Sequence, residues 1–162
     1  SKSSISLFEN LEIFSAAELE MRYQVDLQSY ISKTQIESRT LGDMALNHVI
    51  PTAIQYQNTL IENVRGFKEV YGQSFKKHTQ EQMALLEQIS EHLAAINQGV
   101  VDMVDARKKA NIKDDLKEKA LLYAHHVVPY LNTIRSHCDA LELIVDDALW
   151  PLAKYRELLF IR

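Results

Sequence analysis

The chain contains few residues that can turn a backbone, and this limits it to a small number of long segments. Its 162 residues include only four glycines and three prolines. These two residue types mark most turns and chain reversals, so a chain with many turns would need more of them. The scarcity favours a handful of long helices. The length suits one domain with a sizeable core.

Composition excludes several classes of protein. Hydrophobic residues make up 46% and charged residues 25%, as in globular rather than disordered chains. No apolar run approaches the roughly 18 residues that span a bilayer, and no signal peptide is visible. The net charge of -4 argues against a surface for nucleic acid or anionic membranes. Since the first methionine is Met21, we expect a piece of a longer protein or a processed one.

Apolar residues recur at helical spacing in three stretches. They predict helices over 15–71, 74–110 and 114–147. The short connection between the last two makes them antiparallel neighbours. The predicted fold is therefore all-α: an elongated antiparallel bundle of three long helices, forming a single domain over 1–162 and followed by a docked C-terminal tail, 148–162.

Residues at the predicted helix ends support these boundaries. Ser15 and Glu18 form a capping-box pattern, in which each side chain can bond a backbone N–H at the helix start. Gly72 predicts a stop near Tyr71. An aspartate side chain can cap the third helix, and either Asp114 or Asp115 is in position.

The first predicted helix is unusually long. Its segment 32–42 is polar and rich in Ser and Thr, so the helix either breaks there or runs straight for about 85 Å in an elongated domain. A straight helix overhangs the other two and leaves one apolar stripe without a partner. Either the apolar leader, residues 1–14, packs on the bundle and covers this stripe, or the stripe is an interface. Its residues are Leu19, Tyr23, Leu27 and Tyr30.

Two prolines lie inside strong helical patterns, where proline removes a hydrogen bond and clashes with the preceding turn. Pro51 and Pro129 have similar surroundings, since each follows His-Val and one more β-branched residue. Counting residues from the turns places both prolines opposite Ala95 of the second helix. We predict a bend at each proline at one level of the bundle, with Ala94, Ala95 and Gly99 making room.

The last seventeen residues are unusually apolar for a terminus. Burying side chains of this kind contributes about 1.5–3 kcal/mol each, so we expect the tail to dock on the bundle or on another domain. We call the docking residues the latch, and they are Trp150, Pro151, Tyr155, Leu158, Leu159 and Phe160. Asp146 and Asp147 oppose the dipole at the end of a helix, which predicts a cationic partner, Lys154 or Arg156.

Residues that carry chemistry do not form a recognisable site. His125 and His126 are adjacent and point about 100° apart on a helix, so they cannot easily share an ion. The sequence lacks a glycine-rich phosphate loop, a nucleophile elbow and the carboxylate–histidine spacing of di-iron bundles. Cys138 is the single cysteine, which excludes an intrachain disulfide and suits a reducing cytoplasm. We expect it to be buried in a helix. No catalytic, cofactor-binding or metal-binding residue is predicted.

Four segments resemble the C-terminal helical region of type III glutamine synthetases. Two of them resemble the opening of that region: residues 15–23 (SAAELEMRY) and residues 36–51, which contain IESRTLGDMA and a later Ile-Pro. Residues 140–146 (ALELIVD) lead into a tail, 146–160, that resembles its end. Together they bracket nearly the whole chain in the family's order. One departure is Ala153, where relatives often have a second proline.

The resemblance implies a parent enzyme that joins ammonia to glutamate, using ATP and Mg or Mn ions, in a ring-type homo-oligomer of the cytoplasm. The family's catalytic motifs lie upstream, and nothing in this chain matches them. The resemblance therefore implies a non-catalytic C-terminal domain, inactive alone, that braces the catalytic core and contacts between subunits. The alternative is a free-standing helical adaptor that binds a partner helix in a groove. Neither a nucleic acid nor a membrane is an expected partner.

Overall fold

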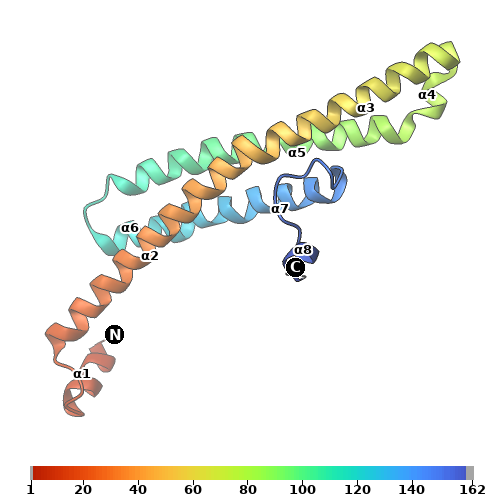
Figure 1. Ribbon diagram of the computed structural model, residues 1–162. Coiled ribbons are helices and arrows are strands. Elements are labelled where there is room, and N and C mark those ends of the chain that lie inside the picture. Colours follow the sequence, from red (N-terminus) through yellow and green to blue (C-terminus); the bar gives the residue numbers. More distant parts are fainter. Residues whose placement is uncertain (1, 160–162) are drawn as a thin grey trace.

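The computed structural model describes residues 2–159, and the regular elements of these residues are all helical (Figure 1). The predicted all-α class is therefore confirmed. The elements are α1 (Lys2–Asn10), α2 (Ala16–Met44), the π-helical turn η1 (Ala45–Val49), α3 (Ile50–Tyr71), the 3-10 turn η2 (Gly72–Ser74), α4 (Phe75–His78), α5 (Gln80–Asn111), α6 (Leu116–Leu122), the π-helical turn η3 (Tyr123–Val127), α7 (Val128–Ile144) and α8 (Tyr155–Leu159).

The first long helical run combines α2, η1 and α3. It begins at the predicted capping box, in which the Ser15 hydroxyl accepts from the Glu18 N–H at 3.3 Å and the Glu18 carboxylate accepts from the Ser15 N–H at 2.8 Å. It ends at Gly72, whose φ of 54° falls in the left-handed region that favours glycine. Both predicted ends are confirmed.

The alternative of a break within 32–42 is wrong, because α2 passes through this segment without interruption. Thr34 and Ser38 are buried there, where α2 packs on the rest of the bundle. The Ser38 hydroxyl donates to the Gln35 carbonyl at 2.9 Å, so its polar group is satisfied inside the helix. Tertiary burial thus outweighs the weak helix propensity of Ser and Thr. The molecule is elongated as a result (Figure 1).

The second long helix, α5, begins at Gln80, six residues after the predicted start at 74. The residues after Gly72 first form η2 and α4, because the chain must reverse direction before α5 can run back along α3. Buried Thr79 lies at the junction, and its hydroxyl donates to the Phe75 carbonyl at 3.1 Å. The predicted helix over 74–110 is therefore interrupted near its start.

The third run combines α6, η3 and α7. Asp115 caps it, accepting from the Glu118 N–H at 2.7 Å, which decides between the two predicted caps. The run ends at Ile144, three residues before the predicted boundary, since Val145 has an extended backbone. The Asp146 side chain then accepts from the Ala148 N–H at 2.8 Å and closes a turn that leads away from the helix.

Each helical proline follows a π-helical turn. In η1 the Ile50 N–H donates to the Ala45 carbonyl, five residues back, and in η3 the Val128 N–H donates to the Tyr123 carbonyl in the same way. Pro51 and Pro129 come directly afterwards. A widened turn displaces the carbonyl groups that a proline ring would otherwise clash with. Two similar sequences therefore adopt the same local structure.

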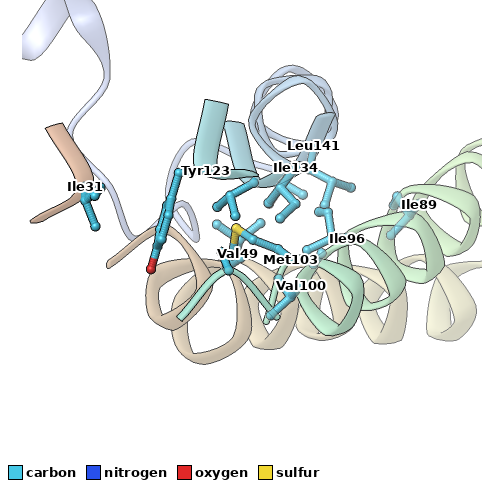
Figure 2. Close-up of a cluster of buried hydrophobic side chains, with 14 of the residues drawn as sticks. Ile31, Val49, Ile89, Ile96, Val100, Met103, Tyr123, Ile134 and Leu141 are labelled. Atoms are coloured by element: carbon cyan, nitrogen blue, oxygen red, sulfur yellow. The ribbon is translucent and has the colours of Figure 1, made fainter. Parts of the chain in front are cut away.

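The hydrophobic core lies where α5 packs against α7 on one side and α3 on the other. Figure 2 shows this cluster between the helices. Gly99 allows α5 and α7 to approach closely, since a Cβ atom there would lie 3.0 Å from Ile134 Cγ1. Ala94, by contrast, is exposed and makes no room for a neighbour. The fully buried side chains with the largest volumes include Tyr123, Ile89, Ile96, Met103, Ile134 and Leu141.

The leader packs only on the start of α2. Helix α1 folds back against the start of α2 and lies at the far end of the molecule (Figure 1). The turn that places it there contains Glu12 with a φ of 52°, and the Glu9 carboxylate accepts from the Ala16 N–H at 3.1 Å. Because this connection is short, α1 cannot reach α5 or α7. Leu7 and Leu11 remain exposed.

None of the helices within residues 2–159 is both long enough and apolar enough to cross a membrane.

Candidate functional site

The first half of the tail docks on the bundle. Trp150 is half-buried against the core cluster, together with Leu149 and Leu152. Lys154 forms an ion pair with Asp147, which confirms the cationic partner predicted for the acidic pair. The Lys154 ammonium group also donates to the Glu142 carbonyl at the end of α7, at 3.2 Å. Apolar contact and a cation at a helix C-terminus therefore hold this segment together.

The second half of the tail does not bury its apolar side chains within this chain. Leu158 and Leu159 lie on α8 and are 63% and 66% exposed. The docked tail predicted from the sequence is thus only partly present: the chain turns away after Lys154, and α8 lies apart from the long helices (Figure 1). Pro151 is exposed at the turn. Phe160 and the side chain of Tyr155 lie outside what the structure describes.

We call residues 2–30, which extend past the other two runs, the overhang (Figure 1). The stripe predicted on it divides into two parts. Leu27 packs against the core, and Leu19 is half-buried. Tyr23 and Tyr30 are 44% and 38% exposed, so they remain available for an interface. The leader leaves both tyrosines uncovered.

A second pair of apolar side chains on the overhang was not predicted. Met21 and Val25 are 67% and 61% exposed. They are four residues apart and so lie on one side of α2. This spacing is the signal that could have identified them. Glu18, Arg22 and Asp26 line a shallow hollow with them.

Histidines from α5 and α7 meet in a contact that the sequence did not predict. Nδ1 of His92 lies 2.9 Å from Nδ1 of His137, so one ring donates a hydrogen bond and the other accepts it. The two residues are 45 positions apart, and only the register of α5 against α7 brings them together. Among the described residues, no group of three or more His, Cys, Asp or Glu side chains could hold a metal ion.

A shallow groove of about 530 Å³ lies beside η3. Its lining includes His125, His126 and Tyr130 from one run and Asp102 and Lys109 from α5. Both histidines are exposed at its edge. The mixed charges give this groove no single preferred ligand chemistry.

Cys138 is half-buried and packs against the core, as expected of a helix cysteine. Burial, with a smaller contribution from the Asp139 charge, raises the pKa of its thiol to about 11. The thiolate is the reactive form, so at pH 8 we expect iodoacetamide to modify Cys138 about a hundredfold more slowly in the folded chain than in urea. Mass spectrometry of timed samples measures both rates. Equal rates would show that the thiol is freely exposed.

Comparison with known proteins identifies the chain's relatives. The model of the family described as "Glutamine synthetase C-terminal domain" matches residues 1–68. A glutamine synthetase of Bacteroides fragilis (strain YCH46) is 47% identical over 93% of the chain, and a type-3 glutamine synthetase of Dictyostelium discoideum is 31% identical over 100% of it. A third relative, a glutamine synthetase of Butyrivibrio fibrisolvens, is 22% identical over 99%.

The chain spans about a fifth of the length of these relatives, 21% of the first and 22% of the other two. The matches extend over both ends of the bundle, including the overhang and the tail. We conclude that the chain belongs to the family of glutamine synthetase C-terminal domains, with a type-3 enzyme among its relatives.

Proposed function

We propose that this chain is the non-catalytic C-terminal helical domain of a type III glutamine synthetase, and that it braces the catalytic core and the contacts between subunits. The parent enzyme would ligate ammonia to glutamate with ATP and divalent metal ions. The chain alone would be inactive. Its partners would be the catalytic domain and neighbouring copies in a homo-oligomer.

The observation that carries this proposal is the exposure of apolar side chains at both ends of a chain that matches only a fifth of its relatives' length. Leu158 and Leu159 are exposed on α8, and Tyr23 and Tyr30 on the overhang. Leaving such side chains in water forgoes about 1.5–3 kcal/mol each, relative to full burial. Apolar surface of this kind is typical of a domain that packs on another part of its protein.

The proposal includes the predicted architecture, an antiparallel bundle of three long helical runs bent at Pro51 and Pro129. The π-helical turns before both prolines support the bends, because sharp kinks are usually found at prolines and π-bulges. A rigid bundle of this kind would be suited to bracing. It would hold the exposed tail and the overhang at fixed positions far apart.

A chimera tests the bracing role. This chain replaces the matching segment of the Bacteroides fragilis relative, and we expect the product to assemble and to have synthetase activity. Changing Leu158 and Leu159 together to Asp should reduce its assembled mass, measured by light scattering, and lower its activity at least tenfold. The isolated chain should have no synthetase activity.

The matched control is Gln55→Asp with Asn58→Asp, which places the same two charges at exposed polar side chains of α3. This variant should assemble as the unmodified chimera does. If the Leu158 and Leu159 variant also assembles and retains full activity, the tail does not brace the enzyme and the proposal is wrong.

A further inference from the structure

We propose that two copies of this chain associate head to tail, with the overhang of one copy docking on the hairpin tip of the next. The overhang is residues 2–30, and the tip is residues 61–80, which include the end of α3, η2 and α4. The proposal deepens the proposed contacts between subunits, and rests on that function for its biological role.

The overhang is a helix without a neighbour along most of its length. From Ala16 to Asp26 every side chain except that of Leu19 is exposed, and α1 lies beside only its beginning (Figure 1). An isolated helix this short is marginally stable in water, so a docking partner would stabilise it. Met21 and Val25 supply apolar contact area on one side, and Tyr23 on another.

The tip also presents apolar surface. Val70 is 76% exposed, and Tyr71 and Ile61 are each 46% exposed. An open groove of about 740 Å³ extends from the tip along α5 and is lined by apolar Phe75, Met83 and Leu86, among others. Lys76 and Glu87 lie at the same groove. It offers a helix a place to lie beside α4 and the start of α5.

The two ends carry opposite charge. The overhang contains five acidic residues and two basic ones. The tip contains four basic residues, Arg65, Lys68, Lys76 and Lys77, and two acidic ones. Opposite potentials on two surfaces steer their encounter and fix their register. Two overhangs would repel each other, as would two tips, so charge selects the contact between unlike ends.

The numbers of helices at the two ends are complementary as well. In the middle of the molecule the three runs lie side by side (Figure 1). At one end α2 extends past the other runs with α1 against its start, and at the other end α3 pairs with the run formed by α4 and α5 (Figure 1). One helix added to a two-helix tip restores a three-helix cross-section. The two ends lie at opposite extremes of the molecule, so they cannot meet within one chain. A contact between unlike surfaces generates a ring if the rotation closes, and an open chain if it does not.

Charge reversal on the isolated chain tests the contact. Sedimentation equilibrium should show concentration-dependent association that weakens as salt is raised. Glu20→Lys with Asp26→Lys should weaken it at least tenfold, and so should Lys76→Glu with Lys77→Glu. All four side chains are exposed, so circular dichroism should show that both variants remain folded. An equimolar mixture of the two variants should recover association, because the reversed overhang of one variant attracts the reversed tip of the other and their unaltered ends also attract each other. The chain carrying all four changes should recover association by itself.

Glu37→Lys is the matched control, since it reverses an exposed charge on α2 outside the overhang. Its association should equal that of the unmodified chain. Two results would overturn the inference: a chain that stays monomeric at about 1 mM, or a fourfold variant that associates no better than the twofold ones. The first result, with Met21→Asp blocking assembly of the chimera, would assign the overhang to the longer protein instead. The chimera tests the proposed function separately, so failure of either can be recognised.

Discussion

Replacing Tyr123 with alanine should lower the free energy of unfolding by about 3–5 kcal/mol, a large share of the stability of a domain this size. Tyr123 is fully buried on η3, and its ring fills the core beside the turn that precedes Pro129. Removing the ring leaves a cavity between rigid helices that cannot collapse around it. Urea unfolding followed by circular dichroism measures the loss.

Tyr123→Phe is the matched control, because it keeps the ring and removes only the hydroxyl. That hydroxyl donates to the Asn111 side chain at 3.0 Å. Asn111 is exposed and can bond water instead, so this change should cost about 1 kcal/mol. If the alanine variant loses no more stability than the phenylalanine variant, the ring does not support the core in the way the structure indicates.

Tyr123 also predicts a dependence of stability on alkaline pH. Burial raises the pKa of its hydroxyl above the ordinary value of 10.0, and outweighs the opposing effects of the hydrogen bond to Asn111 and the charges of Arg107 and Arg39. A raised pKa means that the folded state holds the proton more tightly than the unfolded state. The associated stability is fully present below pH 10 and is lost as pH rises through the folded pKa. The decline should be shallower in Tyr123→Phe, although Cys138 contributes to it in both proteins.

The sequence predicted those features that depend on local chemistry. The capping box at Ser15, the stop at Gly72 and an aspartate cap at Asp114 or Asp115 each involve residues close to the helix end, and the structure has Asp115 as the cap. The pairing of Asp147 with Lys154 is similar, since both residues flank one turn. Such interactions are encoded over short distances, so one sequence is enough to identify them.

Features that depend on distant contacts could not be predicted. Segment 32–42 has weak helix propensity, and only the burial of Thr34 and Ser38 shows why α2 continues through it. The meeting of His92 and His137 requires the register of two helices. The apolar tail could be recognised as a docking segment, but its composition did not reveal which half would find its partner within this chain. That depends on the three-dimensional position of the turn at Pro151.

The tail gives the second large prediction. Trp150→Ala should destabilise the isolated chain by about 2 kcal/mol, less than for a fully buried tryptophan because this side chain is only half-buried against the core. Leu159→Ala should change the stability of the isolated chain by less than about 0.5 kcal/mol, since Leu159 is 66% exposed. Urea titrations of both variants and the unmodified chain give the comparison.

The same two changes should rank differently in the chimera with the Bacteroides fragilis relative. If α8 docks on another part of the longer protein, Leu159 becomes buried there. Leu159→Ala should then weaken the free energy of that contact by about 2–5 kcal/mol. Leu159→Ala would then weaken assembly while Trp150→Ala acts mainly through the stability of the bundle. A Leu159 variant that is neutral in both contexts would remove α8 from the latch, and the latch would then consist of the segment from Leu149 to Lys154 alone. Variants in the two halves of the tail therefore report on different properties: Trp150→Ala on the stability of the bundle, and Leu159→Ala on its contact with a partner.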